Sequence, residues 1–163
     1  MKPWDERPEE IANLLNPAFC SEIIRRCLKK YNQVADKPFD YSLLFLILPI
    51  VLHAPTREQI NTRMRKPMHV WLEQNQYLRI EFGKRAKALV PVTKESISFL
   101  LQNKALLIDD EGKILLKKYK KRKISGHEQG EIADIFKKSE FVGQWFASAG
   151  TPTTIYMMWG VKP

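Results

Sequence analysis

The stretch Leu43-Leu44-Phe45-Leu46-Ile47-Leu48-Pro49-Ile50-Val51-Leu52 is apolar without interruption and carries a proline inside it. A membrane-spanning helix needs about 20 apolar residues, so this run is too short to cross a bilayer and is expected in a folded core. Asp40 lies where a helix N-cap is expected, and the run that follows is apolar on nearly all sides of a helix. Pro49 has no N–H to donate, so it should kink or shorten that helix. The sequence therefore predicts a central helix from Asp40 to Leu52.

Amphipathic segments surround this central run. Asn16-Pro17 is typical of an N-cap followed by proline in the first turn, and apolar residues from Cys20 to Tyr31 then recur at steps of three and four. Thr56 and Gln59 have the spacing of a capping box. Further helices are expected at 55–64, 67–75, 77–90 (ended at Val90-Pro91), from Thr93 with Ile97, Leu100 and Leu101 inward, from 131 to a stop at Gly150, and from Thr151-Pro152 onward.

Two short apolar runs enclose an acidic turn near residue 110. Ala105-Leu106-Leu107-Ile108 and Ile114-Leu115-Leu116 flank Asp109-Asp110-Glu111-Gly112, a pattern that predicts a β-hairpin. A helix followed directly by a hairpin forms the closing half of a winged helix-turn-helix. We therefore expect a mainly α fold with a small β-hairpin, as a winged-helix-like helical domain over 16–163 after a loosely ordered segment 1–15. An unclassified helical domain carrying a hairpin is the alternative.

Length and composition favour an ordinary globular protein. A chain of 163 residues fits one domain. The first residues lack the charged-then-apolar pattern of a secretory signal, so the cytoplasm is the expected compartment. Cys20 and Cys27 lie seven positions apart. On one helix their Cα atoms would be about 10 Å apart, too far for a disulfide, so both are expected as small buried residues.

The positive charge of the chain is uneven. Its formal net charge is +9, and one run without acids supplies six of the positive charges. In a winged helix, such a run at the end of the wing would contact the DNA backbone, whereas a solvated charged loop is the alternative. This basic linker, 117–130, contains the candidate DNA-backbone contacts Lys117, Lys118, Lys120, Lys121, Arg122 and Lys123.

Catalysis is not expected from this sequence. The three histidines, His53, His69 and His127, lie in separate segments without metal-ligand spacing, and the glycines form no phosphate-binding loop. His53 ends the central helix, where a cation would complement the helix dipole. We therefore predict no cofactor, no metal site and no catalytic residues.

The C-terminal segment 131–163 is dense in aromatic residues and methionine. Core packing accounts for some of them, but the two sides of a short terminal helix do not all face one core. The remainder would suit a protein interface, where Trp, Tyr and Met are enriched. The candidate partner-binding residues are Trp145, Phe146, Tyr156, Met157, Met158 and Trp159.

Fragments spread over most of the chain resemble one protein family. The matching fragments are Leu46-Ile47-Leu48-Pro49-Ile50-Val51-Leu52-His53, Pro55-Thr56-Arg57, Trp71-Leu72, Arg85-Ala86, Leu89-Val90-Pro91, Thr93, Gly143-Gln144-Trp145-Phe146, Ile155-Tyr156 and Gly160-Val161-Lys162-Pro163. In this order they resemble the middle component of bacterial three-component ABC-ATPase systems. That family is similar in role to the small subunits of Lamassu-type antiviral defence.

The resemblance implies a non-enzymatic subunit. Such a subunit would join an SMC-like ABC ATPase, which senses invading DNA, to an effector such as a nuclease or another toxic enzyme. The alternative, based on the helix–hairpin pattern and the basic run, is a stand-alone winged-helix regulator that binds duplex DNA. An enzyme remains the least favoured class.

Overall fold

The computed structural model describes residues 15–117 and 130–162. This part of the chain is mostly helical, as the sequence predicted, and includes a small three-stranded antiparallel sheet. The elements are α2 (Pro17–Val34), β1 (Phe39–Asp40), η2 (Tyr41–Leu43, a 3-10 helix), α3 (Leu44–Val51), α4 (Ala54–Gln59), α5 (Met68–Gln74), η3 (Gln76–Arg79, also 3-10), α6 (Phe82–Gln102), β2 (Leu106–Ile108), β3 (Lys113–Leu116), α7 (Gly130–Ser148) and α8 (Pro152–Met158).

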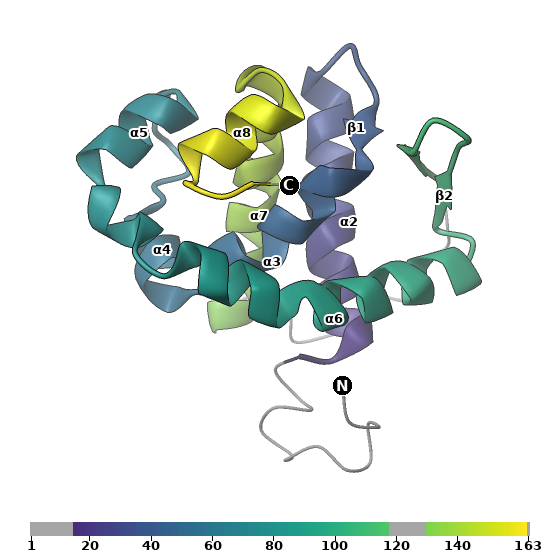
Figure 1. Ribbon diagram of the computed structural model, residues 1–163. Coiled ribbons are helices and arrows are strands. Elements are labelled where there is room, and N and C mark those ends of the chain that lie inside the picture. Colours follow the sequence, from purple (N-terminus) through teal and green to yellow (C-terminus); the bar gives the residue numbers. More distant parts are fainter. Residues whose placement is uncertain (1–14, 118–129, 163) are drawn as a thin grey trace.

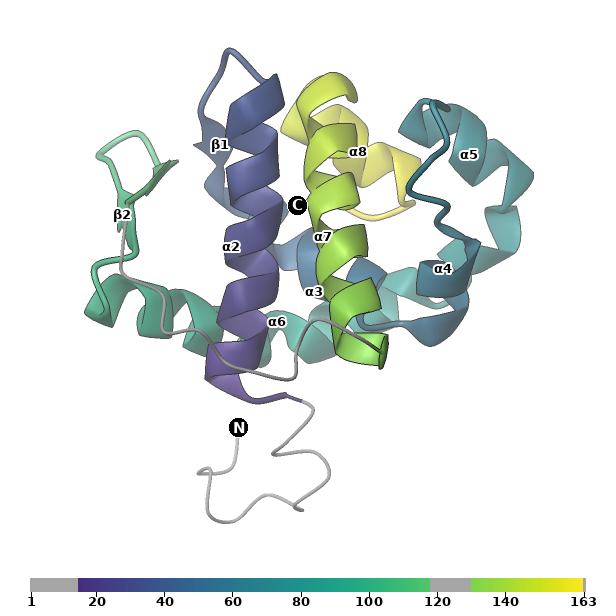
Figure 2. The ribbon, with the colours of Figure 1, turned by 180° about the vertical axis from the view of Figure 1, so that it is seen from behind.

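The apolar run forms the centre of the molecule, as expected. Helix α3 lies between the α2–α7 pair on one face and α6 on the other (Figures 1 and 2). Its side chains from Leu46 to Val51 are almost completely buried. The carboxylate of Asp40 accepts a hydrogen bond from the Ser42 N–H at 2.9 Å, but it caps η2, which leads into α3. The predicted cap is therefore one short 3-10 turn removed from the central helix.

Helices α2 and α7 lie side by side and run in the same direction (Figure 2). Their close approach depends on small side chains. The hydroxyl of Ser139 donates to the Ile23 carbonyl oxygen at 2.6 Å. A Cβ atom placed on Gly143 would lie 2.2 Å from the Cys27 carbonyl oxygen, so only glycine fits there without moving a backbone. Cys20 and Cys27 are both buried and free, which confirms their prediction as small core residues.

The predicted break at Val90-Pro91 is wrong. Helix α6 continues from Phe82 to Gln102 through Pro91, and Thr93 is buried inside it instead of capping a new helix. Proline removes one backbone hydrogen bond, but the helix is held on both sides of Pro91 by tertiary packing. Downstream, the hydroxyl of Ser21 on α2 donates to the Ser96 carbonyl oxygen at 2.8 Å. Leu101, expected inward, is 37% exposed.

The segment between α3 and α6 is more broken than the sequence suggested. Helix α4 ends at Gln59, well before the expected residue 64, and the capping box is absent because His53, not Thr56, is the N-cap. The expected helix 77–90 is the short η3 followed by the start of α6. Between these two, Glu81 adopts a left-handed conformation with φ of 58°, which breaks the helical path.

The predicted hairpin is confirmed, and a third strand joins it. β3 lies between β1 and β2, with Phe39 and Ile108 both opposite Ile114. The Asp109 carboxylate accepts from the N–H groups of Glu111 and Lys113, which closes the turn. The two-residue β1 was missed because it is too short to show alternation. The order helix, strand, helices, hairpin is compatible with a winged-helix-like domain.

Candidate interaction surfaces

Arg57, the last residue of the Pro55-Thr56-Arg57 fragment, connects α4 to α3 and α7. Arg57 on α4 is only 5% exposed. Its guanidinium donates to the Val51 carbonyl oxygen at 3.1 Å, which would otherwise lack a partner at the end of α3. The same guanidinium pairs with Glu131 and lies 3.6 Å from the Asp134 carboxylate, both in the first turns of α7. Arg57 is therefore a buried structural clamp.

Arg85, which belongs to another fragment of the family resemblance, also binds backbone carbonyl groups through its guanidinium. The guanidinium of Arg85 donates at 2.9 Å to both the Leu78 and the Ile80 carbonyl oxygens. These bonds fix the chain between η3 and α6. The sequence assigned no role to either arginine, because their carbonyl partners lie at or near the ends of other helical segments, and the local pattern does not show which side chain reaches them.

His53 differs from its prediction. Its Nδ1 lies 2.7 Å from the Thr56 hydroxyl oxygen, and burial together with Arg85 and Arg57 lowers its pKa below the ordinary value. A lower pKa disfavours the cationic form that would complement the dipole of α3.

The aromatic residues of the C-terminal segment are mainly core residues. Trp145, Phe146, Tyr156 and Trp159 are at most 6% exposed. Trp159 stacks on Phe82 with ring centroids 4.5 Å apart. These four side chains are largely buried in the core, so the isolated chain offers little of their surface to a partner. Of the six candidates, Met157 is 70% exposed and Met158 is partly buried.

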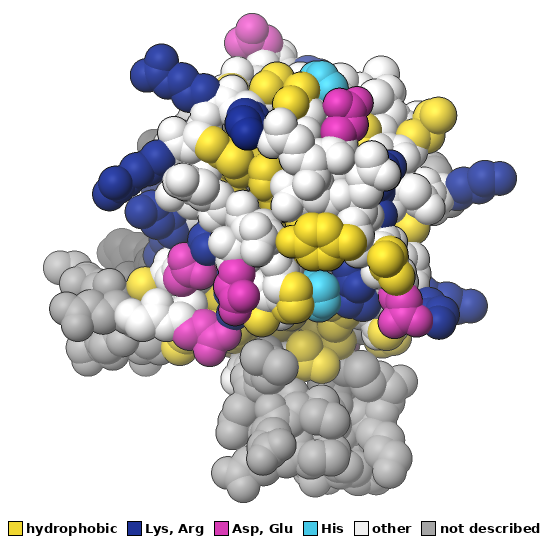
Figure 3. Space-filling view, turned by 90° about the vertical axis from the view of Figure 1, so that its left-hand side faces the viewer, with side chains coloured by type: hydrophobic (Ala, Val, Ile, Leu, Met, Phe, Trp, Pro, Cys, Tyr) yellow, Lys and Arg dark blue, Asp and Glu magenta, His cyan; other side chains and the backbone are white. Residues whose placement is uncertain are grey.

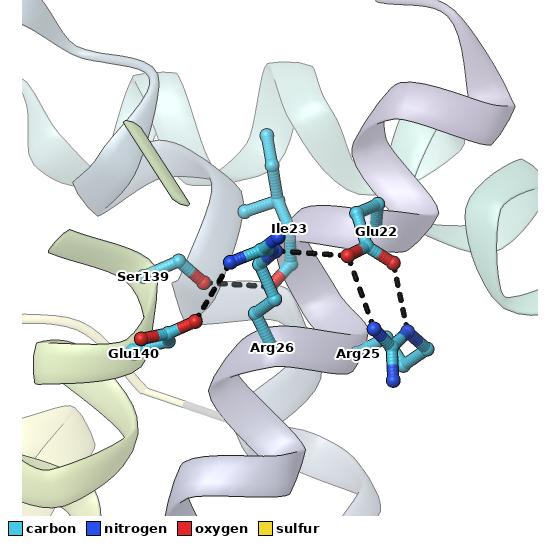
Figure 4. A network of polar contacts seen from close by, with 6 residues as sticks. All are labelled: Glu22, Ile23, Arg25, Arg26, Ser139 and Glu140. Carbon is cyan, nitrogen blue, oxygen red and sulfur yellow. Dashed lines mark hydrogen bonds and ion pairs between the residues drawn. The ribbon is translucent and has the colours of Figure 1, made fainter. Parts of the chain in front are cut away.

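The polar groups that join α2 to α7 are mutually satisfied. Arg26 bridges Glu22 and Glu140 with nitrogen–oxygen distances of 2.8 Å to each (Figure 4). Its guanidinium also lies over the ring of Phe136, at 4.4 Å from the centroid. This network covers the outer edge of the helix pair.

Exposed apolar side chains gather at the two ends of α6. The first group, here named the hairpin surface, comprises Leu107 and Leu115, which face each other across β2 and β3 and are 43% and 44% exposed. The second, the η3–α8 surface, comprises Tyr77, Ile80 and Met157, which are 53%, 67% and 70% exposed. Arg79 donates to the Met158 carbonyl oxygen at 3.4 Å, so η3 and α8 are neighbours. Figure 3 views this end of the molecule and shows hydrophobic side chains among charged ones.

Cavities on the surface of the described part of the chain include two of similar size. One, of about 560 Å³, lies between the loop before α5 and the end of α7, with Arg65, Lys66 and Trp145 among its lining residues. The other, of about 530 Å³, lies between η2–α3, the first half of α6 and the C-terminal residues Tyr156, Val161 and Lys162. The second is named the α6 groove below.

The basic run lies largely outside the described residues. Lys117 is exposed directly after β3. Lys118, Lys120, Lys121, Arg122 and Lys123 fall in the segment that the structure does not describe, so their predicted contact with DNA stays a prediction. The described tip of the hairpin is acidic, with Asp109, Asp110 and Glu111 exposed.

Within residues 15–117 and 130–162, no three His, Cys, Asp or Glu side chains gather as a metal site would require. Burial raises the pKa of Cys20 to about 12, so its thiol is a poor nucleophile at neutral pH. None of the described helices is both long and apolar enough to span a membrane.

Comparison with known proteins identifies the family of the chain. No curated protein matches it, and no solved structure matches it either. A family model described as "ABC-three component (ABC-3C) system Middle Component 3" matches residues 4–163. This match includes every fragment on which the resemblance rested. The chain therefore belongs to the Middle Component 3 family of ABC-three component systems, and is one component of a multi-subunit ABC-ATPase system.

Proposed function

We propose that this chain is a non-catalytic adaptor that joins an SMC-like ABC ATPase to an effector, such as a nuclease or another toxic enzyme. The complex would act in the bacterial cytoplasm as a Lamassu-type defence system against phages or plasmids. Family membership supports the partnership with other components of an ABC-ATPase system. The adaptor role, the nature of the effector and the type of defence are the proposal.

One observation carries the adaptor role. The hairpin surface and the η3–α8 surface lie at opposite ends of α6, a helix of 21 residues. At 1.5 Å per residue this helix is about 30 Å long, so two proteins bound at its ends would not compete for the same residues. Exposed apolar groups of this kind are typical of protein interfaces. An adaptor requires two such separate surfaces.

The test uses the purified chain with the ATPase and the effector encoded beside it. Leu107→Glu combined with Leu115→Lys places an opposite-charge pair on directly opposed strand positions, which removes the apolar surface while keeping the hairpin. Ile80→Glu combined with Met157→Glu does the same for the η3–α8 surface. We expect each double variant to lose one partner and to keep the other, as measured by size-exclusion chromatography with light scattering.

Matched controls separate surface chemistry from folding. Leu107→Val with Leu115→Val keeps the hairpin surface apolar, and Gln76→Glu adds a charge on η3 without removing an apolar group. Both should bind like the parent. Binding of both partners by both charged double variants would contradict the two-surface adaptor, as would failure of the parent chain to bind either subunit.

A DNA-binding regulator is the second candidate. The β2–β3 hairpin that follows α6, with exposed Lys117 at its end, is the observation that favours it. This function predicts duplex DNA binding by the isolated chain, with an affinity that falls steeply as salt rises. Neutralising Lys120, Lys121 and Arg122 should flatten that dependence. Equal salt dependence of parent and triple variant would rule out the basic run as the contact.

A further inference from the structure

The α6 groove has apolar walls contributed by three separate parts of the chain. Phe45 and Leu46 come from α3, Ala86 and Val90 from α6, and Val161 from the C-terminal segment. Apart from the buried Leu46, these side chains are only partly buried. The cavity of about 530 Å³ is thus a surface recess in the apolar packing.

The hydroxyl groups of Tyr156 and Ser42, which line the groove, already have partners. The Tyr156 hydroxyl donates to the Ser42 carbonyl oxygen at 2.7 Å. The Ser42 hydroxyl donates to the Asp40 carboxylate at 2.6 Å, and Lys113 lies 3.8 Å from the same carboxylate. Sites for small molecules usually present a few convergent polar groups that orient the ligand. Since these groups are engaged, the groove is better suited to apolar side chains of a protein segment.

The charged side chains that line the groove are both lysines. Lys87 and Lys162 line it and are exposed, and no carboxylate is among its lining residues. Among the described residues, neither lysine forms an ion pair, whereas Lys84 on the next turn is paired with Glu81 at 2.7 Å. The two free ammonium groups beside an apolar recess are complementary to acidic residues that flank an apolar stripe.

We propose that the α6 groove binds an acidic amphipathic helix of a partner protein. Leucine-like side chains at helical spacing would fill the recess, and Asp or Glu on the flanks would pair with Lys87 and Lys162. The identification of that partner as the ATPase or the effector rests on the proposed function. The preference of the groove for an acidic amphipathic helix does not depend on the proposed function. This preference is tested separately.

The experiment uses the full chain and three synthetic peptides of 18 residues. The first has leucine at positions i, i+3, i+4 and i+7 with glutamate elsewhere, the second replaces every glutamate with lysine, and the third scrambles the first. Binding is measured by fluorescence anisotropy, and the site by backbone amide shifts in NMR spectra. We expect only the first peptide to bind, with shifts centred on Gly83, Ala86 and Val161.

Two variants establish the roles of charge and shape. Lys87→Glu with Lys162→Glu, both at exposed positions, should weaken binding of the acidic peptide by roughly tenfold. Ala86→Trp should block the recess and abolish binding. Lys137→Glu, at an exposed lysine of α7 that does not line the groove, is the matched control and should bind like the parent.

The outcomes distinguish the groove from the adaptor role. Equal binding of the acidic and lysine peptides, shifts centred elsewhere, or no binding of the acidic peptide would overturn the proposal for the groove. Those results would leave the two-surface adaptor intact if the purified subunits still bind. Conversely, groove-specific binding of the acidic peptide supports the proposal even where the chain fails to join the ATPase and the effector.

Discussion

Helix α7 and the β2–β3 hairpin differ in how closely their side chains pack against the rest of the molecule. On α7, the buried Ser139 and Gly143 fit directly against the backbone of α2, and the neighbouring charges are paired. On the hairpin, Leu107 and Leu115 face each other across the strands and remain 43% and 44% exposed. Close packing of α7 stabilises the isolated chain, whereas the uncovered leucines add little to its stability. The comparison suggests that stability and partner binding are assigned to different regions.

The largest expected effect is at the α2–α7 contact. Gly143→Ala places a Cβ 2.2 Å from the Cys27 carbonyl oxygen, so the two helices must move apart. We expect the free energy of unfolding to fall by about 3 kcal/mol, measured by urea denaturation. Gln144→Ala, at the exposed neighbouring position, is the control and should change stability little. An unchanged midpoint for Gly143→Ala would show that the helices tolerate a wider spacing.

Arg57 tests how firmly the start of α7 is held. Arg57→Leu removes the donor to the Val51 carbonyl oxygen and the pairs with Glu131 and Asp134. We expect a loss of about 2 kcal/mol, because a buried carbonyl is left without a partner while both carboxylates retain access to water. Arg57→Lys keeps the charge but not the planar fork, and should recover only part of the loss. Full recovery by lysine would mean that charge alone matters.

Ser139 provides a smaller change in the same interface. Ser139→Ala removes one buried hydroxyl that donates to the Ile23 carbonyl oxygen. We expect a loss of about 1 kcal/mol by the same denaturation measurement. Ser148→Ala, at the exposed end of α7, removes a hydroxyl bonded within its own helix and should cost less. Equal losses for the two variants would argue against a special role of the interhelical bond.

The hairpin should show the smallest effect on stability. Leu107→Thr with Leu115→Thr retains β-forming residues and removes exposed apolar surface. We expect the free energy of unfolding to change by no more than about 0.5 kcal/mol, while the salt concentration at which the protein precipitates rises. A loss comparable with that of Gly143→Ala would show that these leucines are structural, which would weaken the contrast with α7.

Features that depend on neighbouring residues were predictable from the sequence. Asn16 caps α2 by accepting from the Ala18 N–H at 2.8 Å, and Thr151 caps α8 in the same way. The acidic turn of the hairpin and the burial of α3 were also predicted. In each case the determining interaction lies within a few residues or within one uninterrupted apolar run, so the local pattern contains the required information.

The candidate site was less predictable. The sequence showed that the C-terminal aromatics were unusually dense, but not that Trp145 and Trp159 would be in the core while Met157 remained outside. The α6 groove had no signal in the sequence, because its walls come from segments more than 30 positions apart. The family resemblance was confirmed for the middle component of an ABC-three component system, whereas the adaptor role remains a proposal.

The sequence by itself determined the main helices, the hairpin and the burial of the apolar run, since these follow from short-range hydrogen bonding and hydrophobic periodicity. Only the tertiary structure decided that α6 would continue through Pro91, that Arg57 and Arg85 would bind the carbonyl groups of α3 and η3, and that β1 would join the hairpin. The physical reason is that each of these depends on a partner distant in sequence. Packing against α2 and α3 offsets the hydrogen bond lost at Pro91, and no local pattern reports that compensation.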